Sequence, residues 1–371
     1  MSTATKTIHW WQPETGADER DRVLAVLASN YLNDGDVTTE FERRMAAALG
    51  ARYAVATTSG TAALFLSIAA HGIGQGDEVI VPDVTFIATA NAVTLAGAAP
   101  VLVDVDPERL TIDPEVFTAA ITPRTRAVIP VHVSGRAAAI ERVSDIAAAH
   151  GIVVIEDAAE ALRSRHGERW LGAFGQAGCF SFSPNKTITT GQGGLVITGD
   201  EGLMVRLREL KDQGRPVRGT GGNDIHASIG FNFKLTNLQA AVGLAQLERL
   251  DARVRRLADV YRAYREALAG IHEVSVLPFD VDHGETPQWI DALVDDRDRL
   301  VEFLQHAAIQ CRPFWYPIHS QRPYQAAPDR YPVASQLMPK ALWLPSALSM
   351  TDDDVSVVAD RIREFYQGRR G

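Results

Sequence analysis

The stretch YAVATTSGTAALFLSIAAHGIGQGDEVIVP, residues 53–82, shows to which fold class the chain belongs. Residues 53–57 form an apolar run, residues 61–71 are rich in Ala and Leu, and a second apolar run occupies 78–81. Runs of Val and Ile without polar alternation are typical of parallel strands that are covered on both faces. The stretch therefore predicts a strand–helix–strand unit of an α/β protein.

The same alternation continues to about residue 198. We predict further strands and helices between them; the strands are 100–105, 127–133, 152–157, 178–183 and 194–198, and the helices are 87–96, 114–121 and 137–150. This order predicts a large domain with three layers (α/β/α) around a mainly parallel sheet.

The pattern changes after residue 236. Two long helices follow each other over 236–247 and 251–268, and the rest mixes short strands with helices. We therefore place a domain boundary after residue 248, with a large domain over 1–248 and a smaller α+β domain over 249–371.

Composition excludes several classes of protein. The chain has 37 Lys and Arg against 46 Asp and Glu, a formal charge of −9, which argues against binding to nucleic acid. The two cysteines, Cys179 and Cys311, are too few for a disulfide framework and have no metal-ligand spacing, so no metal site is expected. The N-terminus has no apolar signal-peptide core, and the uncharged run 84–103 contains Thr, Gly and Pro and ends in a strand pattern. We expect a cytoplasmic protein with no membrane span.

A first candidate binding motif is TSGTA, residues 58–62, where a strand meets a helix. Free backbone N–H groups and the positive end of a helix suit a phosphate, with Gly60 allowing close approach and Thr61 adding a hydroxyl. An ordinary capped helix would have the same residues. No Gly-Lys-Ser/Thr follows, and the dinucleotide glycine pattern is absent.

Two further motifs carry charged groups. VVIEDAAE, residues 153–160, puts acids at the carboxyl end of a buried strand, and SFSPNKTITTGQGG, residues 181–194, holds Lys186 in a loop between strands. Each is weak alone, because many parallel strands end in Asp and most lysines are surface residues. Together with the phosphate motif they match pyridoxal 5'-phosphate (PLP), which needs phosphate donors, a carboxylate at the ring nitrogen and an amine. Phe86 could stack on the ring.

At this point the sequence resembles the DegT/StrS-type nucleotide-sugar aminotransferases, which have the PLP fold type I of the aspartate aminotransferase superfamily. The resemblance covers nearly the whole chain. Its motifs include Ser59-Gly60-Thr61, 82–91, Pro130-Val131-His132, Glu156-Asp157-Ala158-Ala159, Lys186 with Thr189-Thr190-Gly191, 229–237, Arg312-Pro313-Phe314 and Pro317-Ile318-His319.

The resemblance implies a role for each matching residue. Lys186 would form the Schiff base with PLP and transfer a proton, and Asp157 would pair with the ring nitrogen. The other matching positions would bind cofactor or sugar: Gly60, Thr61 and Ser181 the phosphate, Phe86 the ring, Glu160 the region of the 3-hydroxyl, and Ser183, Tyr316 and His319 the sugar. Asn232 would reach the phosphate of the neighbouring subunit, which implies a homodimer with composite active sites.

Lys186 also favours transamination, since a branch of sugar dehydratases has His at this position. The implied reaction is ping-pong: L-glutamate leaves its amine as pyridoxamine 5'-phosphate and departs as 2-oxoglutarate, and a keto group of a nucleotide-linked deoxysugar then accepts the amine. The sequence of residues 185–191 most resembles that of perosamine-synthase-like enzymes, which act on 4-keto-6-deoxyhexoses.

Several alternatives stay open. A C3-keto-sugar or cyclitol aminotransferase would use nearly the same cofactor site, and glutamine could replace glutamate. A non-catalytic PLP-binding regulatory protein and an NAD-linked oxidoreductase are alternatives of other classes. Glu160, Ser183 and Gln192 depart from the usual family residues. We interpret Ser183 and Gln192 as signs of a changed substrate, whereas Glu160 is either a protonated donor with a shifted pKa or a side chain that points elsewhere. Further substrate contacts are expected from the loop 215–227.

Overall fold

The computed structural model describes residues 6–216 and 224–368, and its centre is a seven-stranded sheet. The strand order is β1-β9-β8-β5-β4-β2-β3, and every pair is parallel except the two that β9 forms with β1 and β8. The strands are β1 (Tyr53–Thr57), β2 (Glu78–Pro82), β3 (Ala99–Val103), β4 (Thr125–Val128), β5 (Val153–Asp157), β8 (Ala177–Ser181) and β9 (Gly194–Thr198). The expected mainly parallel sheet is confirmed.

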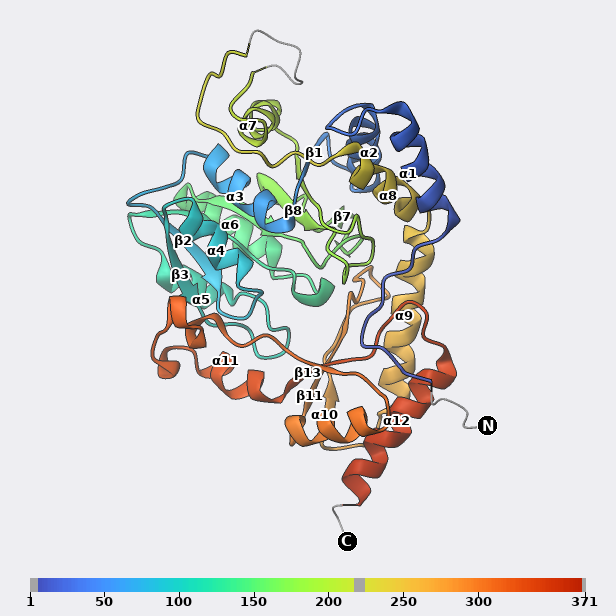
Figure 1. Ribbon diagram of the computed structural model, residues 1–371. Helices are drawn as coiled ribbons and strands as arrows, with labels where there is room; N and C mark the ends of the chain where they lie inside the picture. Colours follow the sequence, from blue (N-terminus) through green and yellow to red (C-terminus); the bar gives the residue numbers. More distant parts are fainter. Residues whose placement is uncertain (1–5, 217–223, 369–371) are drawn as a thin grey trace.

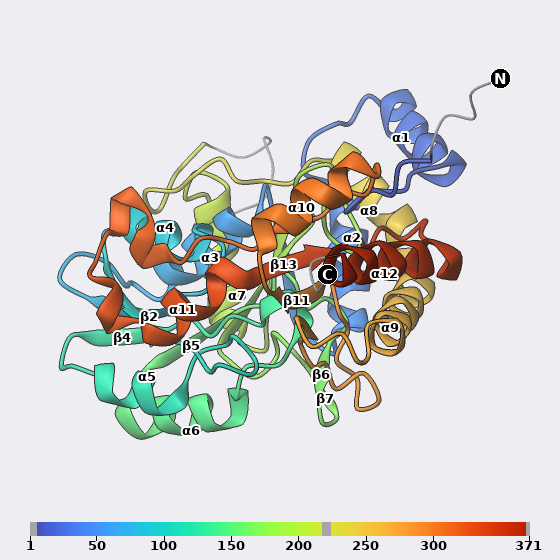
Figure 2. The same ribbon diagram turned by 90° about the horizontal axis from the view of Figure 1, so that it is seen from below.

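Helices cover both faces of this sheet. Alternate residues along one strand point to opposite faces: Val79 and Val81 pack into one apolar core, and Ile80 packs into another. The helices over the first core are α3 (Gly60–Ala70), α4 (Ala88–Leu95) and α7 (Glu201–Lys211); those over the second are α2 (Asp36–Ala48), α5 (Pro114–Ala120), α6 (Ile140–His150) and α8 (Asn237–Glu248). Figure 2 shows α3 and α4 on one side of β2, β4 and β5, with α5 and α6 on the other. This is the three-layer arrangement that the sequence predicts.

The C-terminal part has its own sheet and core. Its four strands run antiparallel in the order β10 (Val274–Val276), β11 (Ile290–Val294), β13 (Ala341–Leu344) and β12 (Arg312–Pro313). The helices around them are α9 (Leu250–Ala267), α10 (Arg297–His306), α11 (Pro332–Leu337) and α12 (Asp352–Gln367). Ile8 forms a bridge with Ile309, and Lys6 pairs with Asp354 at the start of α12, so the first described residues pack here (Figure 1). The domain boundary after Glu248 stays a prediction.

Some elements differ from the sequence expectation. The strand expected over 127–133 ends at Val128, because Val131 makes only an isolated bridge to Asp157 and a short turn, η1 (Val133–Gly135), follows. Four helices and two pairing strands were not expected: α1 (Ala17–Ser29), α2, α7, α11, β11 and β13. A two-residue hairpin, β6 (Arg165–His166) with β7 (Arg169–Trp170), was not expected either. Within the described ranges, no helix is long and apolar enough to cross a membrane.

Candidate active site

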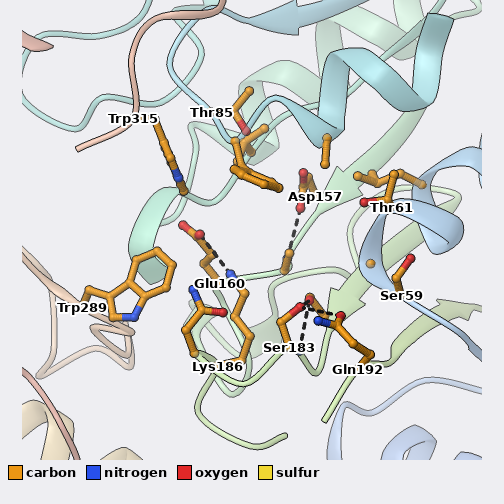
Figure 3. A pocket seen from close by; sticks show the side chains of 18 of the residues that line it. Ser59, Thr61, Thr85, Asp157, Glu160, Ser183, Lys186, Gln192, Trp289 and Trp315 are labelled. Carbon is orange, nitrogen blue, oxygen red and sulfur yellow. Dashed lines mark hydrogen bonds and ion pairs between the residues drawn. The ribbon is translucent and has the colours of Figure 1, made fainter. Parts of the chain in front are cut away.

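A cavity with a volume of about 330 Å³ lies where the ends of β5 and β8 meet the start of α3 (Figure 3). Eight of the eleven site residues expected from the sequence line it: Gly60, Thr61, Phe86, Asp157, Glu160, Ser181, Ser183 and Lys186. They come from segments more than 100 residues apart in the chain. The fold thus brings together the three sequence motifs that we assigned to one cofactor.

The start of α3 forms one wall of the cavity. Ser59 caps the helix, its hydroxyl accepting a hydrogen bond from the Ala62 N–H at 3.1 Å. The first N–H groups of a helix have no partner within the helix, so those of Gly60 and Thr61 can bind an anion. A Cβ atom on Gly60 would lie 2.9 Å from the Cβ of Ser181, so glycine is what lets β8 pass this close. The start of α3 and the Ser181 hydroxyl together form a suitable binding site for a phosphate.

Gly194 on β9 supports this wall from behind, and its replacement by alanine is expected to damage it. A Cβ at Gly194 would lie 2.2 Å from the carbonyl oxygen of Ser59 and 2.7 Å from the Gly60 nitrogen, so the turn must move. We expect Gly194→Ala to lower the free energy of unfolding by about 1–3 kcal/mol and to weaken cofactor binding. Thermal unfolding and cofactor retention on dialysis measure both. Gly199→Ala is the matched control, because no atom lies within 4 Å of its Cβ position; equal effects of the two changes would contradict this account.

Asp157 lies at the carboxyl end of β5 and faces the cavity. Its carboxylate accepts hydrogen bonds from the Thr89 hydroxyl at 2.8 Å and from the Ala159 N–H at 3.1 Å. Burial raises the pKa of Asp157, and these two hydrogen bonds and the charge of Lys186 act against that shift. Its neighbour Glu156 has another task, since it accepts the backbone N–H groups of Gly172, Phe174 and Gly175 and pairs with His132. Of the two acids at the end of β5, only Asp157 lines the cavity.

Lys186 lies opposite, with its amine between Glu160 and Trp289 (Figure 3). The Nζ atom is 3.0 Å from Oε1 of Glu160 and 4.7 Å from the centre of the Trp289 ring. The other oxygen of Glu160 accepts the Ser134 N–H at 2.9 Å. Burial raises the pKa of Glu160, whereas the positive charge of Lys186 lowers it. The side chain of Lys186 is thus held by an acid and an indole ring.

The two other departures from the usual family residues lie on the cavity wall as well. The Ser183 hydroxyl donates to the side-chain oxygen of Gln192 at 3.3 Å and lies 3.1 Å from the Ser181 hydroxyl. The Gln192 backbone carbonyl accepts the side-chain amide of Gln239 at 2.7 Å, which fixes this loop against α8. These neutral groups are placed to contact a ligand beside the phosphate wall.

The remaining three predicted site residues do not line this cavity in the described chain. Asn232 is exposed and makes a bridge to Asp212, and 68% of Tyr316 is exposed. His319 is buried, with Nδ1 2.6 Å from a carboxylate oxygen of Asp83. Burial raises the pKa of Asp83, and the bond to His319 opposes that shift. Their roles at a ligand stay predictions. Residues 217–223 of the expected substrate loop lie outside the described residues.

The sequence interpretation assigned no role to a third wall, which the C-terminal part supplies. Trp289, Arg312 and Trp315 line the cavity there. Figure 3 shows the two indoles at the side of the site away from Ser59 and Thr61. Half of the Phe86 side chain (52%) is exposed, and its ring centre lies 6.4 Å from that of Trp315. No local spacing links these residues to Lys186, so only the packing of the C-terminal part against the large sheet reveals them.

The residues present fit PLP. A buried carboxylate whose pKa is raised by burial is stabilised by a positive partner, which the protonated ring nitrogen of PLP provides. The helix start with Ser181 suits the phosphate, and the Lys186 amine points into the cavity between them. Among the described residues, no group of three or more His, Cys, Asp or Glu is placed to hold a metal ion.

Comparisons with known proteins agree with this fit. Residues 13–363 match the DegT/DnrJ/EryC1/StrS aminotransferase family. The chain is 37% identical over 354 residues to GDP-perosamine synthase of Caulobacter vibrioides, covering 93% of this chain and 95% of that protein. It is 35% identical to GDP-perosamine synthase of Escherichia coli O157:H7, covering 98% and 100%.

Solved structures show the same fold. The structure of S. venezuelae DesV in complex with a ketimine intermediate superposes with a TM-score of 0.88 at 33% identity, covering 94% of each chain. The family match covers most of the chain, and the residues that PLP requires lie together in one cavity. The family resemblance, the fold type and the PLP cofactor expected from the sequence are confirmed, and this chain is a PLP-dependent aminotransferase that belongs to the DegT/DnrJ/EryC1/StrS family.

Proposed function

We propose that this enzyme transfers the amino group of L-glutamate to the keto group of a nucleotide-linked 4-keto-6-deoxyhexose, as a perosamine-synthase-like enzyme. The observation that carries the proposal is the position of the Lys186 amine, which enters the cavity between Glu160 and Trp289 with Asp157 across from it. A lysine at this point supplies both an amine for the cofactor aldehyde and a base for proton transfer.

Each wall of the cavity has a distinct task in this reaction. When bound, PLP supplies an electron-withdrawing ring that stabilises negative charge on the reacting carbon. Asp157 keeps a positive charge at the ring nitrogen, since Thr89 and the Ala159 N–H hold its carboxylate in place. Glu160 holds the Lys186 amine at the cavity while it takes up and returns a proton. The indole rings of Trp289 and Trp315, which form the aromatic wall of the cavity, exclude water from the reacting atoms.

The substrate class is supported by the relatives and by the cavity lining. The two relatives named GDP-perosamine synthase align over nearly their full lengths, so no large insertion separates the chain from them. Ser183, Gln192 and Asn185 offer neutral hydrogen-bonding groups, and Phe86 and Trp315 offer apolar faces. A deoxyhexose presents both hydroxyls and apolar faces, and these groups match it.

A homodimer with composite sites is part of the proposal. Asn232 is exposed beside Ile229, of which 88% is exposed, and Ile225, of which 61% is exposed. Large apolar side chains exposed in one segment are typical of a protein–protein contact. Sedimentation at micromolar concentration tests this, and a monomer that keeps full activity would contradict it. The cytoplasmic location stays a prediction.

The substrate is identified by following the nitrogen. We expect isotope-labelled L-glutamate to transfer its label to a GDP-linked 4-keto-6-deoxyhexose in the presence of the PLP-loaded enzyme, with 2-oxoglutarate formed in equal amount. Mass spectrometry of the sugar product measures the transfer, and dTDP- and UDP-linked 4-keto sugars serve as competitors. The cofactor absorbance spectrum reports the glutamate step separately.

Each other outcome would replace the proposal by a defined alternative. Conversion of the cofactor by glutamate with no labelled 4-amino sugar would exclude the proposed acceptor and direct the search to C3-keto sugars. A cofactor that responds to glutamine alone would favour a cyclitol aminotransferase. A cofactor that responds to neither donor would favour a PLP-binding protein without catalysis.

A further inference from the structure

Arg312 is a charged residue of the cavity whose role the cofactor does not explain. Its guanidinium lies over two indole rings, 4.9 Å from the ring centre of Trp10 and 5.4 Å from that of Trp343. Within the described residues, its side chain has no ion pair and no hydrogen-bond partner. The aromatic rings therefore hold the flat faces of the guanidinium, and the N–H groups around its edge stay available.

The other charged groups of the lining have partners in the chain. Lys186 pairs with Glu160, and Asp157 is held by Thr89 and the Ala159 N–H. Burial lowers the pKa of Arg312, and the negative charge of Glu160 acts against that shift, so the guanidinium is partly removed from water. Among the described residues no carboxylate is in direct contact with this partly desolvated cation, and such a cation gains most from binding an anion.

The position of Arg312 in the cavity indicates which anion it would bind. Its neighbour Trp343 packs 4.6 Å from Trp289, the ring that contacts the Lys186 amine, and 5.0 Å from Trp315, measured between ring centres. Arg312 therefore belongs to the same wall of the cavity as Trp289, the residue that contacts the Lys186 amine. Ser59 and Thr61, which form the phosphate wall, lie on the side of the cavity away from Trp289 and Trp315 (Figure 3).

We propose that Arg312 binds the α-carboxylate of the amino donor. The proposal rests on the proposed function, in which an amino acid supplies the nitrogen. The donor amine must reach the place of the Lys186 amine, and its carboxylate is attached to the carbon next to that amine. A planar guanidinium matches a carboxylate with two parallel hydrogen bonds, which a lysine cannot form. The sugar ring carries no charge at its keto carbon and has no need of this cation.

Arg312→Gln and Arg312→Lys test the proposal in the PLP-loaded enzyme. Calorimetric titration with glutarate, which has carboxylates but no amine to react, measures binding apart from turnover. We expect Arg312→Gln to weaken glutarate about 10- to 100-fold and to raise KM for both glutamate and glutamine similarly, because a charge-assisted bidentate contact is lost. Arg312→Lys should recover part of the affinity. KM for the nucleotide sugar should not change.

Arg299→Gln is the matched control, since it removes one positive charge from the exposed face of α10, away from the cavity. Unchanged glutarate binding in both Arg312 variants would overturn the proposal. A raised KM for the sugar alone would show that Arg312 contacts the nucleotide diphosphate instead. A loss with glutamate but not glutamine would assign it to the side-chain carboxylate. Because the donor step is measured without any sugar, failure of the proposed acceptor leaves this test intact, and Arg312→Lys serves if the Gln variant does not fold.

Discussion

Lys186→Ala is expected to lower turnover by about three orders of magnitude or more, because the change removes both the amine that reacts with the cofactor and the base that moves the proton. The fold should persist, since Lys186 is a loop residue whose side-chain contacts are Glu160 and the Trp289 ring. Steady-state formation of 2-oxoglutarate measures turnover, and circular dichroism measures the fold. Borohydride reduction followed by peptide mass spectrometry should attach the cofactor at residue 186 in the native chain alone.

Two controls separate the amine from the charge of Lys186. Lys186→Arg keeps a cation beside Glu160 but has no amine that loses its proton near neutral pH, so we expect the same loss of turnover. Small amines added in solution should partly restore Lys186→Ala, because the deleted side chain leaves room beside Trp289, and should leave Lys186→Arg inactive. Normal turnover in either variant would refute the assignment of Lys186.

Asp157→Asn is expected to lower turnover by about two orders of magnitude or more, because an amide cannot hold a positive charge at the ring nitrogen. The amide oxygen can still accept from the Thr89 hydroxyl or the Ala159 N–H, so the local geometry should persist. Turnover measures the effect on catalysis, and the cofactor spectrum shows whether PLP is still bound. Turnover within a few-fold of the native value would contradict the role of Asp157.

Asp157→Asn is expected to lower turnover but not the stability of the cofactor-free protein. Burial raises the pKa of Asp157 in the folded chain, so the charged carboxylate favours the unfolded state at pH values above the folded-state pKa. Its contribution to stability is complete below the pKa of the unfolded chain and falls as the pH rises. Asp157→Asn should therefore be at least as stable as the native protein near pH 7 without PLP, as measured by thermal unfolding. A large loss of stability would mean that Asp157 is a structural residue.

The strands of the large sheet follow directly from the sequence. The bounds of β1 and β9 agree with the apolar runs, because a strand buried on both faces must be apolar at every position. The helices α1 and α2 were not predicted, because their local sequence carries little signal. Each begins after a glycine that has no side chain to cap it, and each is stabilised by packing against α8, more than 190 residues later in the chain.

The cofactor residues could be predicted because each group of PLP requires a particular residue type, and a short segment of sequence shows each of them. These are a glycine at a helix start, an acid at a strand end and a lysine in a loop. For the wall formed by Trp289, Arg312 and Trp315, the sequence showed only that Arg312 lies in a motif resembling the family, and it indicated no role for any of the three. These three residues line the cavity, and Trp289 contacts Lys186, only after β11, β12 and β13 pair and pack against the large sheet. The chemistry of the site was therefore readable in local patterns. The choice of which side chains face the substrate depended on contacts between distant segments, for which the order of residues along the chain carries no periodic signal.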